Sequence, residues 1–227
     1  MPMNLNKPRS KKMPLSDRPN NKKNTAKLGR PKSEEKRLGI MAAAEKLILE
    51  LGYSATTMDL VASQAQVSKQ TVYSHFSNKE SLFTAIIVRK CREFQVGEPP
   101  QDASSDVFAT LYKIGLQIVR LLQREEVVAM YRVVIAEVSS NPQVAELFYN
   151  AGPHKSMQMI ADYLLSQKQL ALSRAESHSW AMVFLNMLKG DFHFRSILGL
   201  PYALDEAAQQ KLVTNAVNHL RKLLLSD

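Results

Sequence analysis

The sequence predicts an all-α protein with a three-helix amino-terminal domain and a larger helical carboxy-terminal domain. Apolar residues recur at spacings of three and four along most of the chain, which is the period of helices with one buried face. No segment alternates apolar and polar residues convincingly, as a half-buried strand does. The chain has 227 residues, of which 45% are hydrophobic, so it is long enough for one large or two small domains with true cores.

Positive charge is concentrated at the amino terminus. Residues 1–37 hold 12 Lys and Arg against 3 Asp and Glu, a net charge of +9. Residues 38–95 hold 6 against 5, and residues 96–227 hold 12 against 13. A basic segment beside a DNA-reading motif adds affinity that depends on salt and not on sequence. A solubilising arm, or a segment that binds RNA or acidic lipid, would have the same composition, and these alternatives stay open.

Residues 1–33 are predicted to form a disordered basic arm. Residues 1–28 contain four of the ten prolines and few apolar side chains, so they cannot bury enough surface to offset the entropy lost on ordering. Arg30 then stands between Gly29 and Pro31, and an extended Gly-Arg-Pro of this kind can lay its arginine in a narrow A·T-rich minor groove. Loose contact with phosphate and no role at all are the alternatives.

The DNA-binding domain is predicted to span residues 34–95 and to begin with a long helix. Apolar residues at helical spacing lie between Ser33 and Leu51, with Ser33 as a possible N-cap and Gly52 at the end. Thr56 and Thr57 follow, and either hydroxyl can cap the next helix. The spacing therefore predicts about five turns of helix, a break, and a second helix.

Residues 57–76 contain two short helices joined by a tight turn. Met58, Val61 and Ala62 place one apolar stripe on the first helix, and the pattern stops at Gln66. Ser68 can then cap a second helix whose inner face carries Val72 and Phe76, four residues apart. Two helices joined so closely meet at a steep angle, and the second can project as a ridge that fits the major groove of DNA.

The outward residues of the second helix all suit contact with DNA. Lys69 can donate to guanine O6 and N7, and Gln70 can pair with adenine N6 and N7. Side chains of the other outward residues suit phosphate oxygens, which fix position without reading sequence. A polar surface helix in an ordinary bundle would show the same spacing. The predicted DNA-contacting residues of this segment are Ser68, Lys69, Gln70, Thr71, Tyr73, Ser74 and His75.

Two runs in this region resemble the signature of the TetR/AcrR family of bacterial transcription regulators. VSKQTVYSHFSNKESLF, residues 67–83, carries the tyrosine, the aromatic helix end and the polar start of the next helix. ILELGYSATTMDLVASQAQVS, residues 48–68, is similar to the family's first helix, Gly-Tyr break, Thr-Thr pair and second helix. The resemblance covers residues 34 to about 94 and implies a DNA-binding transcription regulator.

The resemblance also concerns individual positions around the motif. It implies that Thr57, at the amino end of the second helix, contacts a DNA phosphate. Asn78 can cap a fourth helix, where the ammonium of Lys79 in the first turn could reach phosphate across the groove. The chain departs from the family at Gln66, where a glycine is usual. A positive φ there costs a non-glycine residue about 1 kcal/mol.

The carboxy-terminal domain is predicted to span residues 96–227 and to be entirely helical. Pro99 and Pro100 lie in a loop that marks the domain boundary, because proline cannot continue a helix. The last two helices are predicted to be the longest, over residues 174–198 and 205–225. Both have apolar residues on more than one side, as expected if one side packs within the domain and the other against a second copy. A monomer with a thicker core is the alternative.

The resemblance implies a homodimer that binds a palindromic DNA operator, together with a small hydrophobic or amphipathic effector held by the carboxy-terminal helices. The predicted dimer contacts are Met187, Phe194, Val213, Val217, Leu220 and Leu224. The predicted effector contacts are Phe108, Tyr112, Met130, Tyr131, Phe148, Met157, Trp180 and Phe184. These aromatic and methionine residues suit an adaptable pocket, and they equally suit a core. Arg132 and His154 could orient a polar group of the effector, or face solvent.

The sequence offers little support for catalysis, cofactor binding or metal binding. Its five histidines lack the spacing of a metal site, and no glycine-rich phosphate loop or nucleophile elbow is present. The single cysteine, Cys91, cannot form an internal disulfide, and it is either a small core residue or a redox sensor. We find no run of about 20 apolar residues and no apolar secretory segment, so the expected location is the cytoplasm, at the nucleoid.

The sequence thus predicts a homodimeric transcriptional repressor that an effector releases from DNA. The first alternative is a DNA-binding protein of the same fold that acts without an effector, through protein partners. The second is a nonspecific nucleic-acid binder that depends on the basic arm.

Overall fold

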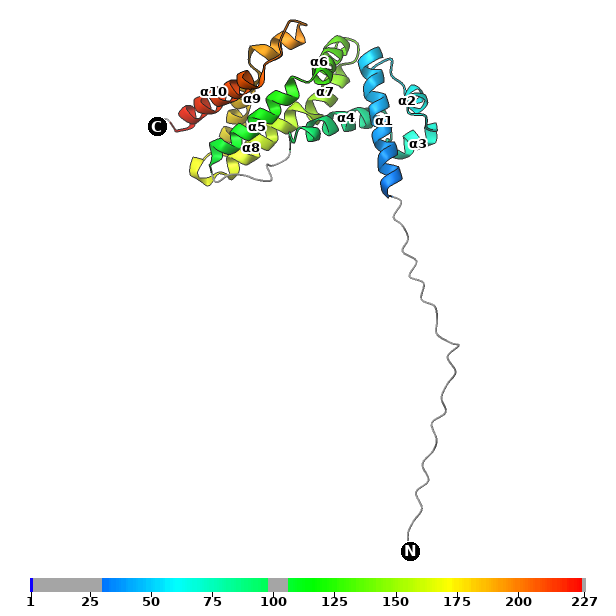
Figure 1. The fold of residues 1–227 in the computed structure, drawn as a ribbon, viewed down its shortest axis with the longest axis horizontal. Coiled ribbons are helices and arrows are strands. Elements are labelled where there is room, and N and C mark those ends of the chain that lie inside the picture. The colour runs from blue at the N-terminus through cyan, green and yellow to red at the C-terminus, as the bar shows by residue number, and fades with distance from the viewer. Residues whose placement is uncertain (2–29, 98–105, 226–227) are drawn as a thin grey trace.

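The computed structural model describes Met1, residues 30–97 and residues 106–225, and every regular element within them is helical (Figure 1). This confirms the predicted fold class. The helices are α1 (Arg30–Leu51), α2 (Met58–Gln64), α3 (Lys69–His75), α4 (Lys79–Glu93), α5 (Val107–Leu122), α6 (Glu125–Glu137), α7 (Pro142–Ala151), α8 (Pro153–Ser166), the 3₁₀ helix η1 (Lys168–Leu170), α9 (Arg174–Ile197) and α10 (Glu206–Leu225).

Short polar residues cap the helices of the amino-terminal head, which we define as α1–α3 with the start of α4. The hydroxyl of Thr57 accepts a hydrogen bond from the backbone N–H of Leu60 at 3.2 Å, and that of Ser68 accepts one from Thr71 at 3.1 Å. Asn78 caps α4 by accepting from the N–H of Ser81 at 2.8 Å. The caps at Ser68 and Asn78 confirm the prediction, and of the two candidates for α2 it is Thr57 that caps the helix, while Thr56 donates to the carbonyl of Gly52.

The start of α1 differs from the prediction. The helix begins at Arg30, so Ser33 lies inside it and is not its N-cap, and residues 30–33 do not belong to a disordered arm. Pro31 explains the difference, because its fixed φ and missing N–H suit the first turn of a helix. The extended backbone expected at Arg30 for minor-groove insertion is also absent. Residues 2–29, with the rest of the predicted arm, lie outside the described residues.

Gln66 forms the turn between α2 and α3 in the left-handed conformation, with φ of 54°. Its N–H donates to the carbonyl of Ser63 at 3.1 Å, and the N–H of Val67 donates to the carbonyl of Ala62 at 3.0 Å. The expected positive φ is therefore present at a glutamine. The strain is held by these backbone bonds and by the burial of Val61 and Val72 on either side of the turn.

The hydrophobic core has two parts, and they do not divide at the predicted domain boundary. One part lies among α5, α8, α9 and α10 around fully buried side chains such as Leu111, Leu164 and Phe184. The other joins α1–α4 to α6 and α7, where Phe83 of α4 shares a cluster with Met130 of α6. Figure 1 shows α4 running from the head into the larger bundle. The core under the recognition helix therefore continues into the carboxy-terminal half of the chain.

Helix α9 bends at Gly190, whose φ of 52° and ψ of −165° are not helical. The sequence predicts one uninterrupted helix here, since a single glycine within a helical pattern is tolerated. A side chain other than hydrogen would be strained at this φ, so glycine permits the bend.

Helix α10 packs mainly inward, which corrects the predicted dimer surface. Val213, Val217 and Leu220 are buried against α5 and α9 within the same chain, so they are not available to a second copy. Their spacing is that of a single buried stripe, and the sequence cannot say which neighbour covers a stripe. Phe194 is 62% exposed, and Met187 and Leu224 are partly exposed.

His193, just after the bend in α9, is buried with its ring edge-on to Tyr131 at 4.8 Å between centroids. Its Nδ1 has no hydrogen-bond partner among the described residues. Burial disfavours the imidazolium and the nearby Lys189 repels it, so the pKa of His193 is lowered from 6.5 to about 4. The ring is therefore neutral in the folded protein at neutral pH.

We expect Gln66→Gly to stabilise the protein by about 0.5–1 kcal/mol, because glycine adopts a positive φ without steric cost. Urea unfolding followed by circular dichroism would measure the change in the free energy of unfolding. Gln66→Ala is the matched control, since alanine retains the Cβ that causes the strain. An equal stability for the glycine and alanine variants would contradict a strained turn.

We also expect acid to destabilise the fold through His193. Its folded-state pKa of about 4 lies below the unfolded value of 6.5. The folding stability that the neutral ring contributes is therefore fully present above pH 6.5 and is lost as the pH falls toward about 4. Thermal unfolding at several pH values should show a weaker pH dependence in this window for His193→Gln. His178→Gln, which changes an exposed histidine of the same helix, should keep the wild-type slope.

Candidate nucleic-acid interface and the cavity behind it

Helix α3 presents a polar ridge on a buried base. Val72 and Phe76 are buried in the head, as predicted, and Arg37 of α1 lies over the Phe76 ring at 4.5 Å. Tyr73 is 52% exposed on the opposite face. The predicted outward residues divide into Ser68, Lys69, Gln70, Tyr73 and Ser74, which are exposed, and Thr71 and His75, which are partly buried.

Hydrogen bonds separate the residues that shape this ridge from those that are available to a ligand. The Ser68 and Thr71 hydroxyls share a bond of 2.8 Å, and Ser74 donates to the carbonyl of Thr71 at 2.7 Å. Within the described part of the chain, the side chains of Gln70 and Tyr73 have no such partner. Gln70 and Tyr73 are therefore the groups that a nucleic acid can engage without breaking a bond in the helix.

Lys69 is paired within the head. Its Nζ lies 2.6 Å from the carboxylate of Asp59 on α2, and both side chains are more than half exposed. Exposed pairs of this kind contribute about 0–1 kcal/mol, so a guanine or a phosphate could replace Asp59 at small cost. Thr57 sits beside this pair as the cap of α2, where the resemblance places a phosphate contact.

Lys79 points toward the protein and not away from it. Its Nζ donates to the carbonyl of Tyr53 at 3.0 Å and lies 4.3 Å from the centroid of the Tyr53 ring. It thereby fastens the turn after α1 to the start of α4. The predicted phosphate contact of Lys79 requires its ammonium to leave this position or to share it.

The same turn is clamped to the end of α6 through Glu137. The Ser54 N–H donates to the two carboxylate oxygens of Glu137 at 2.8 and 3.0 Å, and the Ser54 hydroxyl donates to the same carboxylate. A Cβ at Gly52 would lie 2.6 Å from Glu137 Oε1, so only glycine allows this approach. The sequence gives no sign of a contact between groups 83 residues apart.

A cavity of about 210 Å³ lies behind the head, bounded by α4–α9 with one residue of α1. Of the eight predicted effector residues, four line it: Met130, Tyr131, Phe148 and Met157. Four do not. Phe108 and Phe184 are buried in the other part of the core, and Tyr112 and Trp180 pack at its edge. Phenylalanine and tyrosine occur in both sets, so for these residue types only the packing of the helices separates the two sets.

Four cavity residues that the sequence did not assign come from α4. Ile86, Ile87, Lys90 and Cys91 line the cavity, and the first two also belong to the core of the head. Helical spacing assigns the isoleucines to a buried face but does not show that one end of α4 reaches a cavity. Burial raises the pKa of the Cys91 thiol above its ordinary value, so the protonated form predominates at neutral pH.

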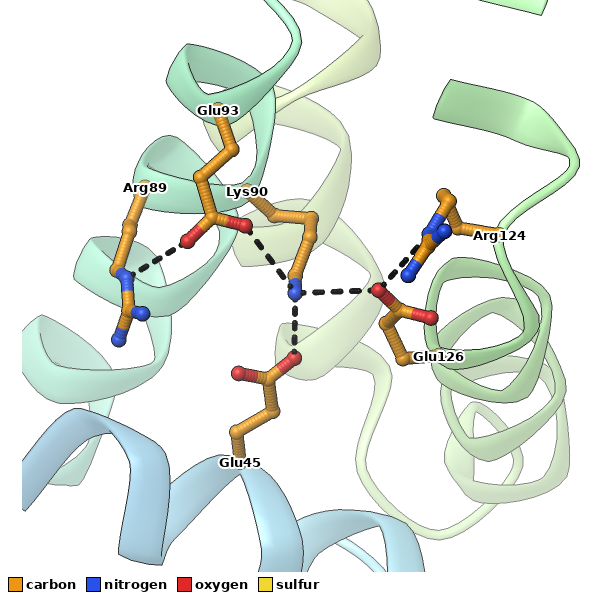
Figure 2. A network of polar contacts seen from close by, with 6 residues as sticks. All are labelled: Glu45, Arg89, Lys90, Glu93, Arg124 and Glu126. Carbon is orange, nitrogen blue, oxygen red and sulfur yellow. Dashed lines mark hydrogen bonds and ion pairs between the residues drawn. The ribbon is translucent and has the colours of Figure 1, made fainter. Parts of the chain in front are cut away.

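A network of charged groups lies along one edge of the cavity (Figure 2). The Nζ of Lys90 lies 3.2 Å from Glu45 on α1, 3.4 Å from Glu93 on α4 and 3.5 Å from Glu126 on α6. Burial lowers the pKa of Lys90, but the three carboxylates outweigh it and raise the pKa above its ordinary value. Lys90 is therefore charged at neutral pH and links three helices.

Two further groups considered for the effector lie elsewhere. Arg132 donates to the carbonyl of Ser196 from Nε at 3.1 Å and from Nη2 at 2.5 Å, which ties α6 to the end of α9. His154 does not line the cavity and lies beside Tyr149, with ring centroids 5.9 Å apart. No group of three or more metal-ligating side chains occurs in residues 30–97 and 106–225. None of the helices described is long and apolar enough to cross a membrane.

The geometry defines a class of protein, a helix-turn-helix DNA-binding regulator with a helical second domain. Residues 40–86 match the family described as bacterial regulatory proteins, tetR family, and residues 109–221 match the AefR-like transcriptional repressor, C-terminal domain. The solved structure of the flavonoid-responsive regulator FrrA is 30% identical, with a TM-score of 0.67 over 84% of this chain and 97% of that one.

Curated relatives agree with this assignment. The HTH-type transcriptional regulator Mb1581 of Mycobacterium bovis is 30% identical over 161 residues, which are 70% of this chain and 75% of the relative. The regulator YvkB of Bacillus subtilis is 27% identical over 169 residues, 70% of this chain and 82% of the relative. The chain belongs to the TetR family of DNA-binding transcriptional regulators, and it is not an enzyme.

We expect Gln70→Ala to relax the preference for one or two base pairs by about 1–3 kcal/mol each, because a bidentate contact to adenine is lost. Binding to a set of single-base variants of the preferred DNA site would measure the change. The amide of Gln70 is exposed, so the thermal stability of the protein should not change.

Lys79→Ala is the comparison for this prediction. It should weaken binding to all DNA sequences alike. The slope of log affinity against log salt concentration should fall by about 0.9 per lost phosphate contact. The substitution should also lower thermal stability, since the carbonyl of Tyr53 loses its donor. Uniform weakening by both substitutions would contradict the base-reading role of Gln70.

Proposed function

We propose that this regulator is a homodimeric repressor that binds a palindromic operator and is released by a small hydrophobic or amphipathic effector. Two copies of α3 would enter successive major grooves, with Lys69 and Gln70 at the base edges. The other predicted DNA contacts would hold the phosphates: Arg30, Thr57, Ser68, Thr71, Tyr73, Ser74, His75 and Lys79. Such a protein acts at the bacterial nucleoid, in the cytoplasm.

The observation that carries effector control is the double role of α4. Phe83 is buried in the core of the head and Lys90 lines the cavity, while Ile86 and Ile87 belong to both. Only the short turn at residues 76–78 separates α4 from α3. A ligand that fills the cavity would therefore act on the helix that positions the DNA-reading ridge, and cavities lined by methionine and aromatic residues commonly take apolar ligands.

Exposed apolar side chains on the last two helices support a dimer. Phe194 and Leu198 at the end of α9 are 62% and 58% exposed, and Leu223 and Leu225 at the end of α10 are 50% and 59% exposed. These helices lie away from the head in Figure 1, where a twofold axis could leave both copies of α3 free. Met187 and Leu224, from the predicted interface, are partly exposed and available to the same contact.

The relatives also favour a ligand-responsive repressor. One matching family is described as a repressor, and FrrA is described as flavonoid-responsive. A planar aromatic effector is compatible with a cavity that contains Tyr131 and Phe148. A protein that acts without an effector, through protein partners, is expected to fill this space with side chains. The cavity of about 210 Å³ therefore favours control by an effector.

We expect selection of bound fragments from random DNA to yield a palindrome, because two copies of α3 related by a twofold axis read the same sequence on both strands. Deletion of residues 1–28 should reduce affinity while leaving the selected sequence unchanged. Loss of all sequence preference in this variant would favour the nonspecific, arm-driven alternative.

The DNA selected in this way is then used to test whether compounds release the protein from its operator, and sedimentation tests whether the protein dimerises. Flavonoids and simpler aromatic compounds that raise the thermal stability of the protein should dissociate it from this DNA, and Phe194→Glu should weaken dimerisation in sedimentation. Tyr73→Phe leaves the dimer surface unchanged and serves as the control. A monomer that selects no palindrome, or a protein that no compound stabilises or releases, would contradict the proposal.

A further inference from the structure

The ion pairs of Lys90 are loose enough for a ligand to compete with them. Its three distances, 3.2, 3.4 and 3.5 Å, exceed the roughly 2.8 Å of a strong charge-assisted hydrogen bond. The Lys90 side chain is 18% exposed and lines the cavity, so an acceptor in the cavity can approach it. One ammonium is thus divided among three carboxylates, and none of them holds it at the best distance.

Glu45 depends on Lys90 more than the other two carboxylates do. Glu93 is also paired with Arg89 at 2.9 Å, and Glu126 with Arg124 at 3.2 Å (Figure 2). Within the described residues, Glu45 has an ion pair with Lys90 alone. Its side chain is 19% exposed at the edge of the network. If one carboxylate gives way to a ligand, Glu45 is the one whose departure leaves the other pairs intact.

The charges around the cavity favour an acid. Apart from Glu45, the charged residues of the network that line the cavity are Lys90 of α4 and Glu126 of α6. Lys189 of α9 also lines the cavity and has no ion pair within the described residues. Helices α4, α6 and α9 therefore offer excess positive charge to the cavity, and Glu45 supplies the balancing negative charge from α1.

We propose that the effector is an aromatic acid whose carboxylate or phenolate replaces Glu45 at the ammonium of Lys90. This inference rests on the proposed function, because it names the chemical class of the effector and the contact through which it acts. The rest of the cavity suits an aromatic body, with Met130, Phe148 and Met157 in its lining. Since an apolar cavity of about 150 Å³ holds benzene, about 210 Å³ suits one or two fused rings.

Exchange at Lys90 would loosen the head on one side only. Glu45 is the link from α1 to this network, and its release removes the ion pair between the middle of α1 and the end of α4, while the apolar packing of α1 on α4 remains. The Ser54–Glu137 contact would remain as a polar link between the turn after α1 and the end of α6. The head could then turn about this contact, which moves α3 relative to its copy across the dimer and lowers affinity for the operator. Ligand and operator would each weaken the binding of the other by the same factor.

The ligand class can be tested without DNA, on the full-length protein. We would titrate 2-naphthoate and its neutral counterpart 2-naphthamide by calorimetry, and expect the acid to bind roughly tenfold more tightly. Glu45→Gln should increase affinity for 2-naphthoate about five- to tenfold and leave 2-naphthamide unchanged, because the competing charge is gone. Lys90→Met should abolish the difference between acid and amide. Glu50→Gln, at an exposed residue of the same helix paired with Lys46, is the control.

The regulatory step is tested with the selected operator. In the wild type, 2-naphthoate should weaken operator binding, whereas Glu45→Gln should weaken it without ligand and reduce the further effect of 2-naphthoate. Three results would each overturn the inference. These are equal affinity for acid and amide, no binding of 2-naphthoate up to its solubility limit, and an effect of 2-naphthoate on operator binding in Glu45→Gln as large as in the wild type. Failure of the proposed function gives a different result: acid preference and the Glu45→Gln effect persist in calorimetry, while no palindrome is selected or no operator is released.

Discussion

Helix α4 is packed on two sides by parts of the chain that are distant in sequence, and the position of the recognition helix depends on this packing. Phe83, with no exposed surface, fixes α4 in the core of the head, and Ile87 reaches the cavity among α5–α9. Because interiors are close-packed, a displacement at one end of a rigid helix is passed to the other. The turn at residues 76–78 joins α4 directly to α3, so the packing of α4 sets the direction of the ridge.

Polar contacts also link the helices that pack around α4. Lys90 gathers carboxylates from three helices, and Glu137 holds the turn after α1 at Ser54. Partly buried ion pairs contribute little net stability, because desolvation offsets much of their attraction. The apolar core therefore joins the head to α6 and α7, and these few charged groups link the same helices at its edge.

The carboxy-terminal helices show why apolar residues on several sides of a helix have more than one explanation. In α10, Val213 and Leu220 cover α5 and α9 of the same chain, whereas Leu223 at its end remains half exposed. In α9, the bend at Gly190 separates a first half inside the bundle from a second half that exposes Phe194. Most of the apolar surface on these helices is thus buried within the chain, and large exposed apolar side chains lie at the helix ends and at Met182 of α9.

The sequence by itself determined the local structure of this protein. Helical period, the caps at Ser68 and Asn78, and the threonine pair that caps α2 all follow from interactions between residues a few positions apart, and the exposed face of α3 follows from the same spacing. Only the tertiary structure decided which of several similar aromatic residues line the cavity, and which carboxylates share Lys90. These outcomes depend on how distant helices pack, and neither residue type nor spacing along the chain records that packing.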